Sequence, residues 1–189
     1  MRAKVACAAL AAVLSSCQTY HGDESSPYYV VPAGSRLILQ QELTIPPNEL
    51  SVFIQNGRAV RKNEVQHYYP FCRLQLYRTS ESARTVRPDE ITITDAAQHR
   101  RQSGALTDAG GLLVARLVVA QDDDRGNGGQ LQSHLTVMEL RSEKQPGIFR
   151  LTCAQWSYKG DIGDRHLTIT EIRQTLEPLF RLRLPSDAS

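Results

Sequence analysis

From Arg36 onward, apolar and polar residues alternate along much of the chain. Successive side chains of a β-strand point to opposite faces of a sheet, so a period of two predicts strands rather than helices. The apolar residues that follow this period are Leu37, Leu39, Leu43, Ile45, Val52, Ile54, Cys72, Leu74, Leu76, Ile91, Ile93, Phe149, Leu151, Cys153, Phe180, Leu182 and Leu184. Two denser apolar runs, 112–120 and 135–140, predict further strands.

Two local signals predict a hairpin and a helix. Asn56-Gly57 is typical of a two-residue hairpin turn, because both residues tolerate the positive φ angles of that turn. Thr168 and Glu171 have the spacing of a capping box at the start of a helix, and Pro178 predicts its end. The sequence therefore predicts a mainly β protein, an antiparallel sandwich or barrel-like sheet, with one short C-terminal helix.

Polar, turn-rich stretches separate these elements. Residues 79–87, 96–109 and 121–130 are predicted to be surface loops. Residues 18–35 are likewise polar and rich in turn-forming residues, which predicts a tether before the domain. Within this tether, the run 28–31 is apolar enough to dock on the domain.

The first residues have the layout of an export signal. Arg2 and Lys4 are followed by an apolar run over residues 5–14. As a helix this run would be about 15 Å long, half of the ~30 Å hydrocarbon core of a membrane, so it is too short to span one. Its length is that of the apolar region of a secretory signal peptide.

The run ends in Leu14-Ser15-Ser16-Cys17, and this arrangement resembles the lipobox of bacterial lipoproteins. The resemblance implies cleavage before Cys17, a diacylglycerol group on its thiol and a further acyl chain on its new amino group. Stable membrane anchoring needs two acyl chains, or one acyl chain and a second membrane-binding feature, so three acyl chains are more than sufficient. Gln18 differs from the aspartate that often retains proteobacterial lipoproteins in the inner membrane, which implies transfer to the inner leaflet of the outer membrane.

The predicted organisation is a signal peptide over residues 1–16, a lipidated tether over 17–35 and a single β-rich domain over 36–189. The whole chain has 22 Lys and Arg against 20 Asp and Glu, and loss of the signal removes two basic residues and no acidic one. A neutral chain lacks the clustered basic face of a nucleic-acid binder, so we predict no nucleic-acid partner. The predicted partners are the lipid bilayer, through acylated Cys17, and another envelope protein.

Cys72 and Cys153 are the two cysteines that remain once Cys7 leaves with the signal and Cys17 carries lipid. Each shares a strand face with apolar neighbours, so both thiols are predicted to point into the same core. In the oxidising compartment that an export signal implies, an even pair favours a disulfide. Two buried free thiols or a metal pair are the alternatives, and a metal pair lacks further ligands at close spacing.

The acidic stretch 122–128 does not fit a calcium loop. In one register a glycine falls where the fifth ligand belongs, and in the next Arg125 falls at the third position and His134 at the twelfth. We therefore predict an exposed acidic loop and no metal site. The histidines show no i, i+4 pair, and each is predicted to be a surface or hydrogen-bonded residue. They are His21, His67, His99, His134 and His166.

No sequence motif points to catalysis. The chain lacks a Gly-x-Ser-x-Gly nucleophile elbow and a glycine-rich phosphate loop that opens a helix. We therefore predict no catalytic residue and no cofactor.

The stretch 67–72, His-Tyr-Tyr-Pro-Phe-Cys, is the richest aromatic patch. Its rings have two interpretations: packing around the core and its rim, which we favour, or the lining of an aromatic pocket. Together with 51–57 and 151–153, this patch resembles an uncharacterised set of proteobacterial lipoproteins. The resemblance concerns the fold of these segments alone and implies nothing about activity.

Three functional hypotheses follow from these features. The first is a non-enzymatic, membrane-anchored envelope lipoprotein with a structural or interaction role at the periplasmic face of the outer membrane. The second is a small-molecule or lipid-binding β domain with an apolar cavity near Tyr68, Tyr69 and Trp156. The third is a periplasmic hydrolase whose nucleophile, histidine and carboxylate come together from distant parts of the chain.

Overall fold

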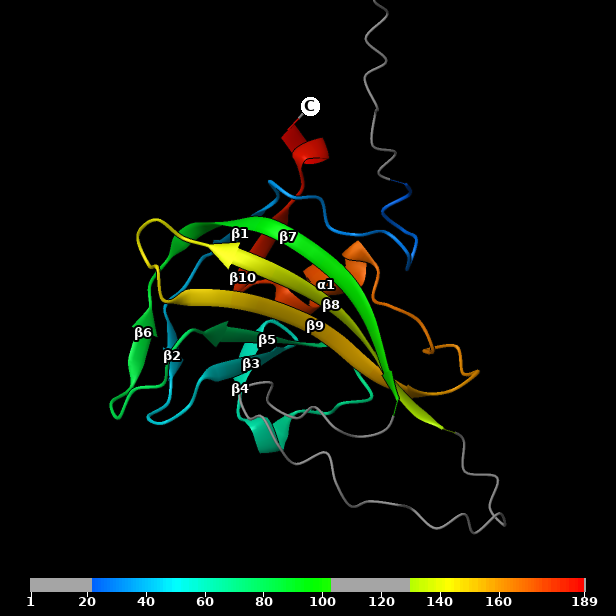
Figure 1. Ribbon diagram of the computed structural model, residues 1–189, viewed down its shortest axis with the longest axis horizontal. Coiled ribbons are helices and arrows are strands. Elements are labelled where there is room, and N and C mark those ends of the chain that lie inside the picture. The colour runs from blue at the N-terminus through cyan, green and yellow to red at the C-terminus, as the bar shows by residue number, and fades with distance from the viewer. Residues whose placement is uncertain (1–21, 103–129, 189) are drawn as a thin grey trace, which may run out of the picture.

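The computed structural model describes residues 22–102 and 130–188 of the chain. Eight strands form one antiparallel sheet in the order β10-β1-β7-β8-β9-β5-β3-β4, which curls into a half-barrel (Figure 1). Its strands are β1 (Arg36–Leu39), β3 (Ser51–Gln55), β4 (Arg58–Val60), β5 (Phe71–Leu76), β7 (Asp89–Gln102), β8 (Leu131–Arg141), β9 (Ile148–Tyr158) and β10 (Phe180–Arg183). Two short strands, β2 (Leu43–Ile45) and β6 (Arg84–Val86), pair with each other beside this sheet.

The helical elements are few. Within the described residues there is one α-helix, α1 (Ile169–Leu176), together with two 3-10 turns, η1 (Lys62–Glu64) and η2 (Pro185–Ala188). The predicted fold class is therefore confirmed: the protein is mainly β with one short C-terminal helix. Of the two predicted layouts, the structure has the barrel-like sheet.

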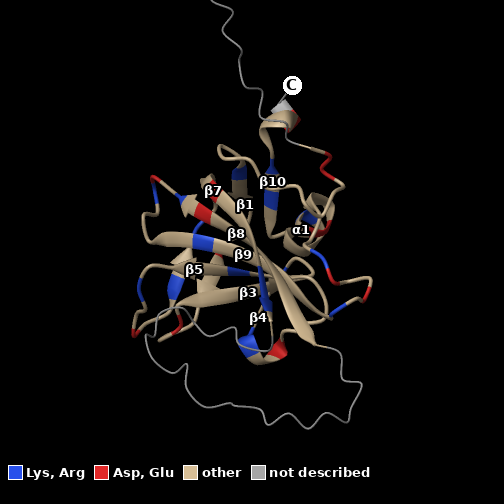
Figure 2. Ribbon diagram, turned by 45° about the vertical axis from the view of Figure 1, so that its right-hand side comes forward, with Lys and Arg blue, Asp and Glu red and all other residues tan. Residues whose placement is uncertain are grey.

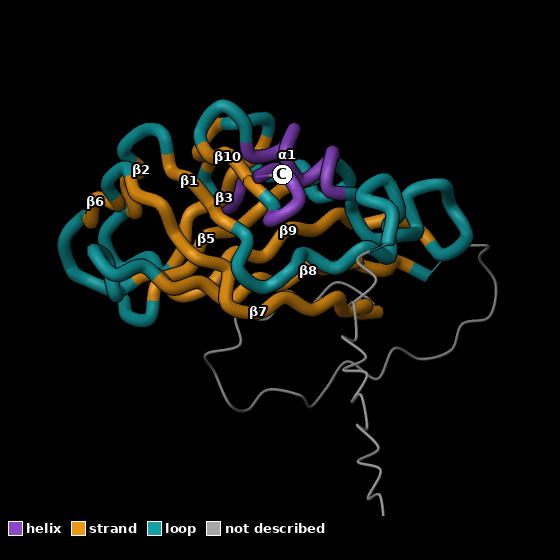
Figure 3. The backbone as a smooth tube through the Cα atoms, turned by 90° about the horizontal axis from the view of Figure 1, so that it is seen from above, coloured by secondary structure: helices purple, strands orange, loops and turns teal. Residues whose placement is uncertain are grey.

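The main hydrophobic core lies on the concave face of the half-barrel, and α1 packs there (Figure 3). The helix contacts β10 at one end of the sheet and β3 and β5 toward the other. Its side chains Ile169, Ile172 and Leu176 are at most 1% exposed. Burial of such side chains stabilises the fold by about 1.5–3 kcal/mol each. The amphipathic helix thus bridges the open half-barrel and completes its core.

The start of α1 confirms the predicted capping box. Thr168 Oγ1 accepts a hydrogen bond from the Glu171 N–H at 3.3 Å, and the Glu171 carboxylate accepts one from the Thr168 N–H at 2.8 Å. Arg165 donates two further hydrogen bonds to this carboxylate, at 2.7 and 2.8 Å. The Arg165 guanidinium lowers the pKa of Glu171 to about 2, so the cap is charged at neutral pH.

The predicted hairpin turn at Asn56-Gly57 is also confirmed. It joins β3 to β4, and its residues have φ angles of 52° and 71°. The Gly57 N–H donates to the Thr175 carbonyl oxygen at 2.9 Å. The turn is therefore docked on the C-terminal end of α1, which ties one end of the sheet to the helix.

Two predicted loops contain strands, so the loop prediction is wrong there. In 79–87, the three residues of β6 include one apolar side chain, too few to show a period of two. In 96–109, β7 continues to Gln102 because it pairs with β8, although its side chains there are half-buried or exposed. Pairing rather than burial fixes these residues as strand. The rest of that stretch lies outside the described residues, as does the predicted strand 112–120.

The predicted inward direction of Phe149 is wrong for a different reason. The pairing of β5 with β9 shifts beside Phe149, which becomes the extra residue of a β-bulge. Ile148 takes the core position instead and is 2% exposed. Phe149 lies against Tyr77, with 4.6 Å between ring centroids. A bulge moves the alternation by one residue, which a strict period of two cannot anticipate.

The segment before β1 packs on the domain. Tyr29 and Val31 are buried, and Gln98 Nε2 donates to the carbonyl oxygens of Pro27 and Tyr29 at 2.9 and 3.3 Å. Docking of the apolar run 28–31 therefore occurs as predicted. Cys17 and the predicted signal lie outside the described residues. Within the described ranges, no helix has the length and apolarity needed to cross a membrane.

Candidate functional site

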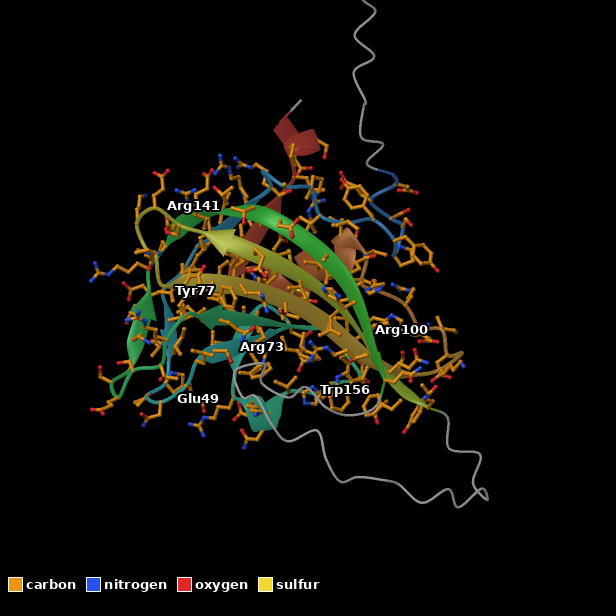
Figure 4. All side chains as sticks on the ribbon, viewed as in Figure 1. Glu49, Arg73, Tyr77, Arg100, Arg141 and Trp156 are labelled. Carbon is orange, nitrogen blue, oxygen red and sulfur yellow. A yellow bond between two sulfur atoms is a disulfide. The ribbon has the colours of Figure 1, made fainter. Side chains whose placement is uncertain are left out.

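The concave face changes from apolar to polar along its length. On β8 and β9, the inward-facing positions at one end of the sheet carry polar side chains, which we call the polar row. The polar row consists of Gln132, His134, Thr136, Gln155 and Ser157. All five are buried, with exposed fractions of 1–7%. Arg100 pairs with His134 across β7 and β8, so its label in Figure 4 marks this end of the sheet.

The segment 159–167 lies directly over the polar row. Gln155 Nε2 donates to the Gly163 carbonyl oxygen at 2.8 Å, and His134 Nε2 lies 2.7 Å from the Asp164 carboxylate. The same carboxylate accepts a hydrogen bond from the Gly160 N–H at 2.9 Å. The Gly160 N–H and His134 hold the pKa of Asp164 below its usual value. Asp164 is therefore an ionised acceptor, and His134 Nε2 carries the donated proton.

A second histidine, His166, lies beside His134. Their ring centroids are 5.0 Å apart and the rings meet edge-on. Burial lowers the pKa of His166 to about 4, helped by the basic groups of His134, His99 and Arg100. His166 is therefore neutral at physiological pH.

Buried polar atoms without hydrogen-bond partners concentrate at this place. Among the described residues, five such atoms belong to the polar row and His166: Gln132 Oε1, His134 Nδ1, Thr136 Oγ1, Ser157 Oγ and His166 Nδ1. The other three in the described chain are His67 Nδ1, Arg84 Nε and Trp156 Nε1. Native proteins pair the large majority of buried polar atoms, because an unpaired one is expensive. The polar row is therefore a candidate functional site.

The pair of His134 with Asp164 invites comparison with a hydrolase. In such enzymes one imidazole nitrogen bonds a carboxylate and the other bonds a nucleophile. Here Nε2 bonds Asp164, and Nδ1 has no hydrogen-bond partner among the described residues. Within the described residues, the pair of His134 and Asp164 therefore has no nucleophile hydrogen-bonded to its free nitrogen.

A second candidate site is an open groove of about 930 Å³ beside β3 and β4, which we call the edge groove. Its lining combines apolar side chains such as Val52, Phe53 and Val60 with charged ones such as Glu49 and Arg61. Glu49 is labelled in Figure 4, at a distance along the molecule from Arg100. The edge groove and the polar row are therefore separate features.

The edge groove lies where β4 stops short of β3. Val60, the last residue of β4, pairs with Phe53. Among residues 22–102 and 130–188, Ser51 and Val52 of β3 pair only with β5. After Arg61 the chain turns into η1 instead of continuing the strand. A strand that is paired on one side only is a template for the addition of another strand.

The predicted aromatic patch packs as core and rim. Phe71 is 2% exposed and belongs to a second apolar cluster, on the face of the sheet opposite the main core. His67 stacks on Trp156, with 4.3 Å between ring centroids. Tyr68 and Tyr69 are 55% and 63% exposed. The two tyrosines therefore lie on the surface instead of lining an apolar cavity, in agreement with the interpretation that the sequence favoured.

Cys72 and Cys153 form the predicted disulfide between β5 and β9. The two residues are direct register partners, and both are 0% exposed. Their Cα atoms are 4.0 Å apart, slightly closer than the usual range of about 4.4–6.8 Å. Direct pairing in neighbouring antiparallel strands accounts for this short separation.

The sequence did not predict the polar row. Each histidine was expected on the surface or with a hydrogen-bond partner, and His134 has such a partner in Asp164. Its burial beside His166, 32 residues away in sequence, was not predicted. One signal was present: at every second position of β8, the apolar residues change to Thr, His and Gln. The predicted strand 135–140 includes Thr136 but begins after Gln132 and His134. The acidic stretch 122–128 and His21 lie outside the described residues.

No protein-family model matches this chain, and no curated protein and no solved structure matches it either. The arguments for function therefore rest on the chain's own residues.

Proposed function

We propose that this protein is a non-enzymatic, lipid-anchored protein of the cell envelope that binds an extended segment of a partner protein in the edge groove. The observation that carries the proposal is the early end of β4. Within the described part of the chain, it leaves Ser51 and Val52 of β3 paired on one side only. The groove beside them supplies both apolar and charged side chains for an incoming segment.

An extended segment is the occupant that suits this groove. Backbone N–H and C=O groups at a free strand edge bind another strand, and alternate side chains of the added strand then meet the lining. Phe53 and Val60 supply apolar contacts, and Glu49 and Arg61 offer one charge of each sign. Basic and acidic residues are also interspersed over the described part of the molecule (Figure 2), which suits a protein partner better than nucleic acid.

The anchor is proposed from the first residues of the chain. The basic start, the short apolar run and Leu14-Ser15-Ser16-Cys17 stand in the order of a lipoprotein signal. Gln18 supports a position at the inner leaflet of the outer membrane, with the domain in the periplasm. A formed disulfide between Cys72 and Cys153 suits that oxidising compartment.

Replacement of Cys17 by serine should abolish membrane anchoring. Serine has no thiol to accept the diacylglycerol group, so Cys17→Ser should either leave the signal uncleaved or release the protein from the membrane fraction. Fractionation, together with the mass of the mature N-terminus, measures both results. Cys7→Ser, within the predicted signal, is the matched control and should stay anchored. Unchanged size and membrane partition of Cys17→Ser would contradict the anchor.

Occlusion of the edge groove should abolish partner capture. Ala59 lines the groove and is exposed, so Ala59→Arg fills it with little effect on the core. A photo-reactive residue placed at Asn63, which also lines the groove, should yield one discrete cross-linked adduct in intact cells. Ala59→Arg should remove this adduct. Thr94→Arg, at an exposed position of β7, should leave it intact. An adduct that persists in Ala59→Arg would show that the groove is not the docking site.

A further inference from the structure

The first described residues fold back on themselves through two turns. The Ser26 N–H donates to the Asp23 carbonyl oxygen at 2.8 Å, and the Tyr29 N–H donates to the Ser26 carbonyl oxygen at 3.1 Å. Gly22 lies against the Tyr29 ring as a result, since a Cβ on Gly22 would be 3.8 Å from Tyr29 Cδ2. The point where the described chain begins is therefore next to the apolar run 28–31.

Side-chain and backbone contacts hold this segment in place on the domain. Arg173 of α1 donates to the Glu24 carboxylate at 3.4 Å, and the Ser186 hydroxyl of η2 donates to it at 2.9 Å. Before β1, the Gly34 N–H donates to the Ile93 carbonyl oxygen of β7 at 2.8 Å. The segment is thus tied to α1, η2 and β7, and its position on the domain is fixed.

The connection from this segment to the proposed anchor is short. Cys17 and Gly22 are five residues apart in the sequence. Five residues span at most about 18 Å, even when the chain is fully extended. The remainder of the predicted tether, from Gly22 onward, is folded on the domain. If Cys17 carries lipid, the surface around Gly22 must therefore lie within this distance of the bilayer.

Two apolar side chains on this surface point away from the domain. Within the run 28–31, Tyr29 and Val31 are buried, whereas Tyr28 is 80% exposed and Val30 is 42% exposed. Tyrosine is enriched at membrane–water interfaces, because its ring is apolar and its hydroxyl is polar. The outward pair thus has the chemistry of an interfacial contact, and it lies beside the place where the chain runs toward Cys17.

The charges beside this pair suit zwitterionic lipid. An open hollow of about 690 Å³ lies next to Tyr28 and Val30. The residues of the described chain that line it include two carboxylates, Asp23 and Asp95, and no Lys or Arg. Carboxylates repel an anionic headgroup, whereas they attract the ammonium group of a zwitterionic one, as does the face of a tyrosine ring.

From these observations, we propose that Tyr28, Val30 and Ala33 form a membrane-docking surface that lies directly on a bilayer of zwitterionic lipid. The proposal rests on the lipid anchor of the proposed function and deepens it, because it fixes how the anchored domain is oriented. The start of the described chain (blue) lies at the top of the molecule in Figure 1, and β4 lies near the bottom. The edge groove beside β4 is then held at the end of the molecule away from the bilayer.

Fluorescence quenching by lipid tests this orientation. In the mature chain Cys17 would carry lipid, and Cys72 and Cys153 are joined, so an introduced cysteine is the single free thiol. Ala33→Cys places a fluorophore on the docking surface, and Asn63→Cys places it on the edge groove. The lipidated mature chain is reconstituted in phosphatidylcholine vesicles that carry a headgroup quencher. The probe at position 33 should be quenched at least about threefold more than the probe at position 63.

Removal of the outward apolar pair should weaken this contact. Tyr28→Ser/Val30→Ser should lower the quenching of the probe at position 33 at least about twofold, while the protein still floats with the vesicles. Tyr69→Ser/Tyr77→Ser is the matched control: these tyrosines are 63% and 60% exposed but lie outside the segment, so quenching should be unchanged. Vesicles that also contain anionic phosphatidylglycerol should quench the probe no more strongly than phosphatidylcholine alone.

Three outcomes would overturn the membrane-docking surface. They are equal quenching of the two probes in protein that floats with the vesicles, undiminished quenching in the folded double variant, and stronger quenching in the anionic vesicles. The comparison of the two probes uses the otherwise unchanged chain, so it is decisive even if the double variant unfolds.

Flotation separates failure of this surface from failure of the anchor. A chain that does not float with the vesicles has no lipid anchor, and the membrane-docking surface that depends on the anchor is then overturned with it. A chain that floats with equally quenched probes has the anchor and lacks the surface. The cross-linked adduct at the edge groove reports on partner binding alone and is independent of both results.

Discussion

Loss of the disulfide should lower the free energy of unfolding more than most single changes in this protein. Cys72 and Cys153 stand 81 residues apart in sequence, and their bond restricts the unfolded chain over that whole loop. The chain-entropy estimate for a loop of this length is about 4.5 kcal/mol, an upper figure because residual structure in the unfolded chain reduces it. Domains are typically stable by about 5–15 kcal/mol, so the share is large.

The measurement is denaturant unfolding of the double variant Cys72→Ala/Cys153→Ala beside the unchanged protein, each with and without reductant. The unchanged protein should lose stability once its disulfide is reduced in the unfolded state. The double variant should start with the lower midpoint and be insensitive to reductant. Both side chains are fully buried, so native protein should resist alkylation until it unfolds. Equal midpoints for the oxidised protein and the double variant would show that the bond contributes little.

The disulfide also shows what alternation predicts well. Cys72 shares its face with Leu74, and Cys153 shares its face with Leu151; all four are 0% exposed. The face of the sheet on which a side chain lies is a local property, since it follows from a period of two within one strand. Local signals were equally reliable at the helix start, where Thr168 and Glu171 form the predicted capping box.

Strand order, bulges and strand ends depend on residues far apart in the sequence. β7 runs to Gln102 through polar residues because β8 lies beside it, and Phe149 leaves the core because the register shifts. Neither the pairing of β7 with β8 nor the register shift can be recognised from the local alternation of apolar and polar residues. For the same reason, the edge groove could not be predicted, since it depends on β4 ending at Val60 while β3 extends to Ser51.

Part of the polar row could be predicted from the sequence. Alternation predicts that Thr136 shares a face with apolar Met138. A polar side chain on a buried apolar face needs an explanation, because burial of a polar group is costly unless the group is hydrogen-bonded. The pattern could not supply the segment 159–167, whose Asp164 and His166 meet β8 only in the folded chain. A polar residue in register with a buried face is thus a signal of a site, and the tertiary fold identifies its companions.

The second large effect is expected at Gly57, where the β3–β4 turn meets the end of α1. Its φ angle is 71°, in the left-handed region that costs other residues about 1–2 kcal/mol. A Cβ at this position would overlap the Glu177 carbonyl group and lie 2.5 Å from Pro178 Cδ, whereas real Cβ contacts stay above 3.0 Å. The overlap is with backbone, so no side-chain rotation relieves it.

Gly57→Ala should therefore lower the free energy of unfolding by about 3 kcal/mol or more, the sum of backbone strain and displacement of the turn from the helix. Displacement would also break the hydrogen bond from the Gly57 N–H to the Thr175 carbonyl oxygen. Gly34→Ala is the matched control, because Gly34 has a φ of 88° and its Cβ would meet no atom within 4 Å. Chemical denaturation of the two variants separates the terms: the control should lose the strain energy alone, about 1–2 kcal/mol. If Gly57→Ala loses no more than Gly34→Ala, the turn does not rest on the end of α1, and the helix does not tie this end of the half-barrel in place.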